Sequence, residues 1–311
     1  MKAPFSAYLD SIEPALRRLV GILGEEFEYV SVLSTDSVGF QLALSQHSKS
    51  VTNQNRTTER GSVVRVYRGG RYSEYAFNEF DPEKVTEKAA VISSELQKQF
   101  ALLELCGSET LETPILDDEP IELFCEKEAE ILPETADTAK LIDALQSVSD
   151  EGVRTIPGAL DCQAGGSSTH ISKLFLSKNR TMRQSYVYTE GMYAAFAPSK
   201  EGEMKMVYEG VSGLCGPEIL FTLKEKIREA PKIMEDVLGS EKIVPGEYDV
   251  ITSPDVTGLI AHEAFGHGVE MDMFVKGRAL GADYIGKRVG SELVTMHEGA
   301  LCAEDVTSYA F

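Results

Sequence analysis

The 311-residue sequence predicts an α+β protein whose strands form antiparallel sheets. The N-terminal part follows the order helix, strands, helix, and a later stretch contains strand-like runs that turn residues separate at short spacing. We expect an N-terminal α+β domain at residues 1–110 and a central helix and antiparallel-sheet domain at 111–242. A third segment at 243–311 is expected to begin with a strand and a helix that carries two histidines.

Within residues 1–110, apolar residues at helical spacing predict one helix at about 9–26, and a second helix is expected to begin at Pro82. Strand-like runs lie between them at 29–33, 38–44, 63–67 and 72–77. The last two runs flank Gly69 and Gly70. Because both glycines accept a positive φ, this arrangement predicts a β-hairpin.

The central segment begins with acidic residues and two prolines, so we interpret residues 107–130 as a connection. A helix at about 139–152 follows. Strands are predicted at 171–176, 185–188 and 192–196. The last helical pattern, at 220–237, is expected to break or kink at Pro231.

The composition excludes several classes of protein. A formal net charge of −20 and the lack of a basic stripe disfavour nucleic-acid binding. The apolar runs are too short to span a membrane, and the acidic N-terminus does not resemble a secretory signal. Five scattered cysteines are typical of a reducing compartment. We therefore expect a cytoplasmic protein with neither nucleic acid nor membrane as a partner.

The residues with the most specific chemistry follow a predicted strand at 248–251. Ser253, Pro254 and Asp255 are typical of the start of a helix, since they offer a capping hydroxyl, a first-turn proline and a carboxylate near the positive end of the dipole. The apolar residues that follow are expected to form the buried face of this helix. They are Val256, Leu259 and Ile260.

His262, Glu263 and His267 come next on the same predicted helix. Two imidazoles and a carboxylate are suitable ligands and a suitable base for a catalytic zinc site. Residues five apart on a regular α-helix differ by about 140° in direction, so the two rings could not share an ion there. We therefore predict a π-bulge or kink between the histidines, which Gly266 would facilitate. The alternative is a buried helix whose histidines bond to backbone.

The segments Gly246–Val250 and Thr257–Asp272 resemble the TldD/PmbA family of zinc metallopeptidases, in its motif-bearing, TldD-like type. The resemblance implies that His262 and His267 bind Zn²⁺ and that Glu263 is the general base of a HExxxH metallopeptidase. It also implies a third ligand, a cysteine, beyond residue 311. Residues 243–311 would then be the truncated start of the C-terminal domain, and this chain alone could be inactive.

The same resemblance implies short or unfolded peptides as substrates, and a homodimer or a heterodimer with a motif-less homologue. Two other functions remain open from the sequence. The chain could be a non-catalytic assembly or binding subunit of a peptidase complex. It could also belong to a zinc hydrolase that cleaves amides other than peptides.

Several further residues have competing interpretations. Glu270 and Asp272 could bind metal or orient a histidine, or they could cap a helix or face solvent. Cys162 and His170 are interpreted as parts of a loop rather than as a nucleophilic pair. The remaining histidines, His47 and His297, are expected at the surface. Cys106, Cys125 and Cys215 are expected in the core, and Cys302 is interpreted as a core residue rather than as a metal ligand.

Overall fold

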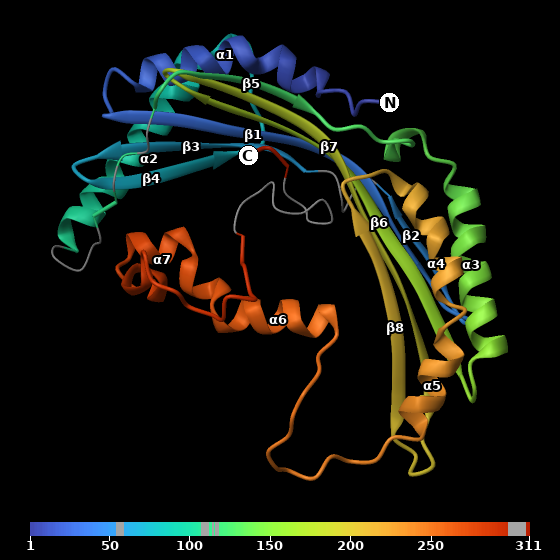
Figure 1. Cartoon of the computed structure of the whole chain (residues 1–311). Coiled ribbons are helices and arrows are strands. Elements are labelled where there is room, and N and C mark those ends of the chain that lie inside the picture. The colour runs from blue at the N-terminus through green and yellow to red at the C-terminus, as the bar shows by residue number, and fades with distance from the viewer. Residues whose placement is uncertain (54–58, 107–111, 114, 116–117, 298–308) are drawn as a thin grey trace.

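The computed structural model describes residues 1–53, 59–106, 112–113, 115, 118–297 and 309–311. In this part of the chain, eight strands form one curved sheet, with helices on its outer, convex side (Figure 1). Helices α6 (Pro254–Ala264) and α7 (Met271–Val275) lie on the inner side of the curve (Figure 1). The predicted α+β fold class is confirmed.

Three long strands form the centre of the sheet: β1 (Tyr29–Leu44), β6 (Asp161–Ser177) and β7 (Arg180–Pro198). Two short strands pair with β1 on its other side, and two with β7. The strands that pair with β1 are β3 (Arg60–Arg68) and β2 (Lys49–Asn53). The strands that pair with β7 are β5 (Ile121–Glu126) and β8 (Met204–Gly213). Strand β4 (Arg71–Phe77) extends the sheet beyond β3. All pairs are antiparallel except β5 with β7.

The predicted hairpin is confirmed between β3 and β4. Its two turn residues are Gly69 and Gly70, whose φ angles are 59° and 73°. These left-handed conformations match the twist of the flanking strands, and glycine adopts them without the steric cost of a Cβ.

Two groups of helices cover the convex face. Helices α1 (Ala7–Leu23) and α2 (Val85–Leu105) cover one half, and α3 (Thr138–Thr155), α4 (Leu223–Lys226) and α5 (Ala230–Leu238) cover the other (Figure 1). Each group encloses its own apolar core against the sheet. The first core includes Leu16, Ile92 and Val64, and the second includes Leu145 and Leu220, all nearly inaccessible to solvent.

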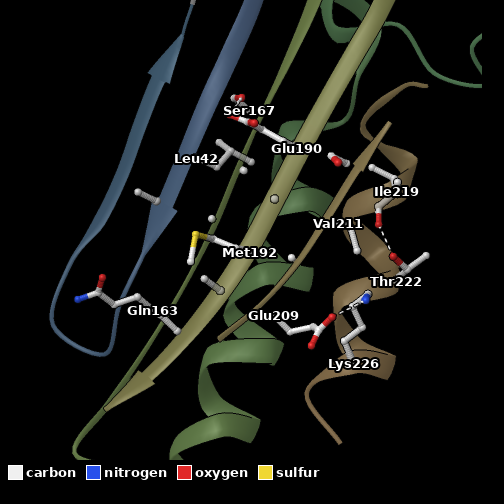
Figure 2. Close-up of a pocket in the computed structure, with 18 of the residues that line it drawn as sticks. Leu42, Gln163, Ser167, Glu190, Met192, Glu209, Val211, Ile219, Thr222 and Lys226 are labelled. Carbon is white, nitrogen blue, oxygen red and sulfur yellow. Dashed lines mark hydrogen bonds and ion pairs between the residues drawn. The ribbon is translucent and has the colours of Figure 1, made fainter. Parts of the chain in front are cut away.

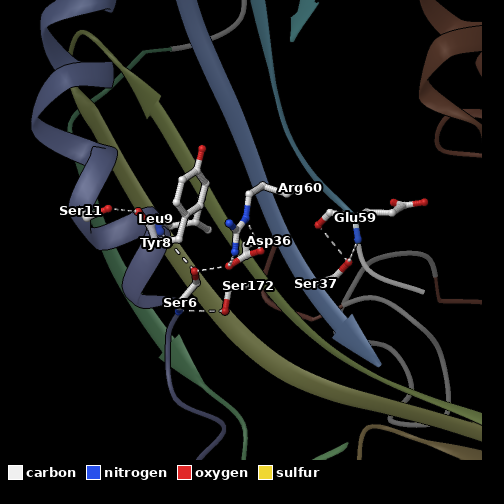
Figure 3. Close-up of polar contacts among 9 residues, drawn as sticks. All are labelled: Ser6, Tyr8, Leu9, Ser11, Asp36, Ser37, Glu59, Arg60 and Ser172. Atoms are coloured by element: carbon white, nitrogen blue, oxygen red, sulfur yellow. Dashed lines mark hydrogen bonds and ion pairs between the residues drawn. The ribbon is translucent and has the colours of Figure 1, made fainter. Parts of the chain in front are cut away.

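The start of α1 is tied to the sheet by a polar network (Figure 3). Ser6 caps the helix, because its Oγ accepts a hydrogen bond from the Leu9 N–H at 3.2 Å and donates one to Asp36 at 2.5 Å. The Ser6 N–H donates to Ser172 Oγ at 3.1 Å, and Arg60 Nε donates to Asp36 at 2.9 Å. Residues from β1, β3 and β6 therefore fix where α1 begins.

Replacing Leu145 with Ala is expected to lower the free energy of unfolding by about 2–5 kcal/mol, because the side chain is fully buried and its removal leaves a cavity. Chemical denaturation measures this change. Leu105→Ala is the matched control, since Leu105 is 83% exposed and its loss should cost less than about 0.5 kcal/mol. Equal costs for the two variants would contradict the packing of α3.

Several sequence-based predictions of strands were wrong. The strands predicted at 29–33 and 38–44 are one strand, because β6 pairs with β1 continuously from Ser31 to Leu44. Strand β5 lies within residues 107–130, a segment that the sequence indicates as a connection. It forms because an edge of β7 is available for parallel pairing. The chain at 248–251 is not a strand and has no pairing partner among the described residues.

The strands predicted at 185–188 and 192–196 are also one strand, β7. Gly191, between them, does not mark a turn. A Cβ there would collide with the Leu220 side chain, so the glycine allows the chain after β8 to pack closely on the sheet. The helix predicted at 220–237 is interrupted, with α4 ending at Lys226 and α5 beginning at Ala230. Pro231 lies in the first turn of α5, where its missing N–H costs nothing.

The sheet contains strands from both 1–110 and 111–242, since β1 pairs with β6. The division of the chain into three domains at those boundaries stays a prediction. Among the described residues, no helix has both the length and the apolarity required to cross a membrane.

Candidate metal centre

Helix α6 (Pro254–Ala264) carries the first two residues of the candidate site. It begins where the sequence predicts, with Ser253 in an extended conformation, Pro254 in the first turn and Asp255 next. The Ser253 side chain makes no capping hydrogen bond. Instead, the Ser253 carbonyl accepts hydrogen bonds from the backbone N–H of Thr257 at 2.9 Å and from its hydroxyl at 2.8 Å.

The helix ends between the two histidines. Phe265 leaves the helical conformation with φ −143° and ψ −22°, and a 3₁₀ turn follows at Gly266–Val269. The rings of His262 and His267 then lie close together, with centroids 4.5 Å apart and planes at 67°. The predicted departure from a regular α-helix is therefore present, as a helix end rather than as a π-bulge.

His262, Glu263 and His267 each offer one ligand atom, and these atoms lie within 4.8 Å of one another. All three side chains are exposed. Two nitrogens bound to one zinc ion lie at most about 4.2 Å apart, given Zn–N distances of about 2.0–2.1 Å. The observed limit of 4.8 Å on the spacing of the ligand atoms is close to this value. Its donors, two imidazoles and a carboxylate, are ones that zinc accepts.

His267 has two carboxylates near its ring. Glu270 Oε1 lies 2.7 Å from Nδ1, and Glu263 Oε2 lies 3.8 Å from Nε2. The hydrogen bond to Glu270 and the negative charge of that residue raise the pKa of His267 above its ordinary value of 6.5. Of the two carboxylates, only Glu270 is within hydrogen-bond distance. The Glu263 carboxylate thus remains available for other chemistry.

The predicted buried face of α6 was wrong. Val256, Leu259 and Ile260 are 46%, 57% and 53% exposed, and no residue of the helix is buried. The helix packs against the 3₁₀ turn that follows it rather than against either apolar core. Among the described elements, the turn that follows is therefore the main packing partner of this helix.

A cavity on the sheet reaches the beginning of this helix. Its lining includes Gln163 of β6, Glu190 of β7, and Glu209 of β8, which pairs with Lys226 of α4 at 2.8 Å (Figure 2). Asp255 at the start of α6 lines the same cavity, whereas the two histidines and Glu263 do not. The cavity and the candidate metal centre are thus separate features that share one helix.

The other predicted site residues lie elsewhere. Asp272 pairs with Lys276 at 2.6 Å, so its carboxylate is not directed at the histidines. Cys162 and His170 belong to strand β6 rather than to a loop. Eight residues along a strand correspond to about 26 Å, so the two side chains cannot act as a nucleophilic pair.

The environments of the remaining histidines and cysteines are mixed. His47 and His297 are exposed, as expected. The expected burial of three cysteines was wrong: Cys106 is exposed, and Cys125 and Cys215 are half-buried. Their positions at a helix end, in an edge strand and after β8 keep part of each side chain in solvent. Cys302 lies outside the described residues.

The sequence did not indicate a network of hydrogen bonds around the buried residue His170. Its Nδ1 lies 2.6 Å from Glu134 Oε1, and its Nε2 lies 2.9 Å from Ser185 Oγ. The Ser185 hydroxyl also donates to the Pro4 carbonyl at 3.0 Å. These residues come from distant parts of the sequence, and no spacing pattern links them. The network anchors the N-terminal segment, and Ser185 is fully buried, so no substrate reaches its hydroxyl.

Cys162 is expected to resist alkylation in the native protein, whereas Cys106 should react. Burial, and secondarily the charge of Asp161, raise the pKa of the Cys162 thiol to about 12, so very little thiolate forms at pH 8. Mass spectrometry after brief treatment with iodoacetamide distinguishes the two sites. Labelling of both at equal rates without denaturant would contradict the placement of Cys162 under α3.

The fold and the candidate site together define an α+β protein with a histidine–glutamate cluster at a helix end. The family model of the PmbA/TldA metallopeptidase C-terminal domain matches residues 245–311, which include this cluster. A metalloprotease of Synechocystis is 24% identical over 97% of this chain and 63% of its own length. A metalloprotease TldD homolog of Buchnera aphidicola is 38% identical over 22% of this chain and 14% of its own length.

Solved structures share the fold. TldE from Thermococcus kodakarensis superposes with a TM-score of 0.56 at 12% identity, over 87% of this chain and 58% of that one. A candidate modulator of DNA gyrase from Bacteroides thetaiotaomicron superposes with a TM-score of 0.64 at 10% identity, over 83% of this chain and 57% of that one. The C-terminal segment of the chain is thus similar to the PmbA/TldD metallopeptidases, and the fold of the chain is shared with TldE. The chain spans at most 63% of the length of the two curated relatives described above.

Proposed function

We propose that the intact protein is a zinc-dependent peptidase in which His262 and His267 bind the metal and Glu263 is the general base. The observation that supports this most directly is the helix end at Phe265, which turns two histidines five residues apart toward each other. Relatives named as metalloproteases support the same reaction class. A third protein ligand is expected beyond residue 311.

When bound, zinc would act as a Lewis acid toward the scissile carbonyl and make a water molecule more acidic. Glu263 accepts the proton of the attacking water and later transfers it to the leaving amine. Glu263 suits this role because its carboxylate lies beside both imidazoles and accepts no hydrogen bond within the described part of the chain. His262 and His267 contribute neutral ring nitrogens.

We propose short or unfolded peptides as substrates. An extended peptide could lie along the sheet and reach α6, because the cavity lined by β6, β7 and β8 extends to Asp255. In this proposal the protein works in the cytoplasm, as a homodimer or as a heterodimer with a motif-less homologue. Peptide bonds, rather than other amides, are the preferred target because the relatives are named as proteases.

The test is metal-dependent cleavage by the intact protein. Elemental analysis is expected to find zinc, and an unstructured fluorogenic peptide should be cleaved at a rate that a chelator abolishes and that added zinc restores. Cleavage that persists in the chelator would contradict the proposal. Zinc binding without cleavage of any peptide in a diverse library would favour the non-catalytic subunit instead.

A further inference from the structure

We propose that Glu270 is a positioning residue that holds the His267 ring with Nδ1 toward its own carboxylate and Nε2 toward the metal. This inference rests on the proposed function, since it concerns how one of the two histidines is presented to the ion. It assigns Glu270 a role that differs from that of Glu263, although both carboxylates lie next to the same ring.

The hydrogen bond determines which nitrogen carries the proton. Glu270 Oε1 lies 2.7 Å from His267 Nδ1, and an ionised carboxylate can only accept a hydrogen bond. In the neutral ring the hydrogen therefore resides on Nδ1, and the lone pair resides on Nε2. Nε2 is also the atom that faces Glu263, at 3.8 Å. The nitrogen left free to bind metal thus lies on the side of the candidate centre.

The backbone brings Glu270 to this place. The 3₁₀ turn that contains His267 ends at Val269, and Glu270 follows in an extended conformation, with φ −62° and ψ 127°. It is the residue immediately before α7 (Met271–Val275). Glu270 therefore lies three residues after His267, between the 3₁₀ turn and α7, and these two elements fix the position of its backbone.

Packing alone would not orient this ring. The His267 side chain is 53% exposed and that of Glu270 is 48% exposed, so solvent surrounds much of both. A ring in such a position rotates freely unless a directed contact restrains it. The hydrogen bond to Glu270, at 2.7 Å, is the shortest polar contact of this ring among the described residues.

Neighbouring carboxylates do not compete for this role. Asp272 is held by Lys276 at 2.6 Å. Glu263 is 3.8 Å from the opposite nitrogen, which is too long for a hydrogen bond. Carboxylates that accept the second N–H of a metal-binding histidine fix its tautomer, and their removal typically weakens metal affinity by about 10–100-fold.

The test uses Glu270→Ala, Glu270→Gln and, as the matched control, Asp272→Asn. In the metal-free protein, ¹⁵N NMR at a pH where the ring is neutral reports the tautomer of His267. The wild type and the control are expected to carry the hydrogen on Nδ1, and Glu270→Ala should lose this preference. Glu270→Gln should retain most of it, because the amide oxygen still accepts a hydrogen bond.

Zinc affinity, measured by competition with a chromophoric chelator, is expected to fall about 10–100-fold in Glu270→Ala and less in Glu270→Gln. The control should bind as the wild type does. An unchanged tautomer, or equal affinity of Glu270→Ala and wild type, would overturn the positioning role. Equal and large losses in both Glu270 variants with an unchanged tautomer would make Glu270 a direct ligand and overturn it too. A wild type that binds no zinc would instead refute the proposed function, which the metal-free NMR result does not test.

Discussion

Glu263→Gln is expected to lower kcat for peptide hydrolysis by about 10²–10⁴-fold while leaving the bound zinc in place. The amide keeps the size of the carboxylate but cannot accept the proton of the attacking water. Metal retention is expected because the substitution leaves both imidazoles in place, and their rings lie 4.5 Å apart. Steady-state kinetics with an unstructured peptide, together with elemental analysis of the same sample, measure both quantities.

Glu292→Gln provides a control of matched chemistry, since Glu292 is exposed and lies outside the cluster. It should hydrolyse the peptide at the wild-type rate. A Glu263→Gln protein that holds zinc and cleaves as fast as the wild type would remove Glu263 from the reaction. Loss of zinc together with activity would make Glu263 a ligand rather than the base.

Replacing His267 with Ala is expected to weaken zinc binding by more than about 100-fold, because the loss of a direct ligand should exceed the effect of removing a residue that only orients one. His262→Ala should have a similar effect, since the ligand atoms of both histidines belong to the same cluster. Competition with a chromophoric chelator gives the affinities, and circular dichroism confirms that the variants are folded.

His297→Ala is the control for this experiment, because His297 is exposed and does not belong to the cluster. Its zinc affinity should equal that of the wild type. If His262→Ala and His267→Ala differed little from this control, the zinc would be bound elsewhere in the protein.

The parts of the fold that local chemistry determines were predictable from the sequence. Two glycines between strand-like runs indicated the β3–β4 hairpin, and helical periodicity located α1 and α3 within a few residues. Strand length was not predictable, because it depends on the neighbouring strand. The polar residues in the middle of β1 resemble a turn in the sequence, but they belong to the strand because β6 pairs with them.

The role of a glycine can also depend on distant contacts. Gly191 reads as a break in the sequence, yet it lies inside β7 because Leu220 needs the space that a side chain would fill. The residues at 248–251 predicted a strand, but pairing requires a partner that the described residues do not offer. Contacts distant in sequence decided each of these cases.

The sequence indicated which residues form the candidate site. It also indicated that the helix between the two histidines must depart from regular α-helical geometry. The rotation of about 140° between positions five apart is a property of any regular α-helix, so a break was required if the histidines were to converge. The form of the break, a helix end at Phe265, was not predictable. The same holds for the choice between Glu270 and Asp272, because it depends on the turn between His267 and α7.

Anomalous diffraction at the zinc edge, from crystals of the intact protein, tests the convergence of the two histidines most directly. We expect one peak at about 2.0–2.1 Å from a ring nitrogen of His262 and from Nε2 of His267. A peak bonded to only one of these rings, or no peak at this position in zinc-loaded crystals, would contradict the assignment of the site.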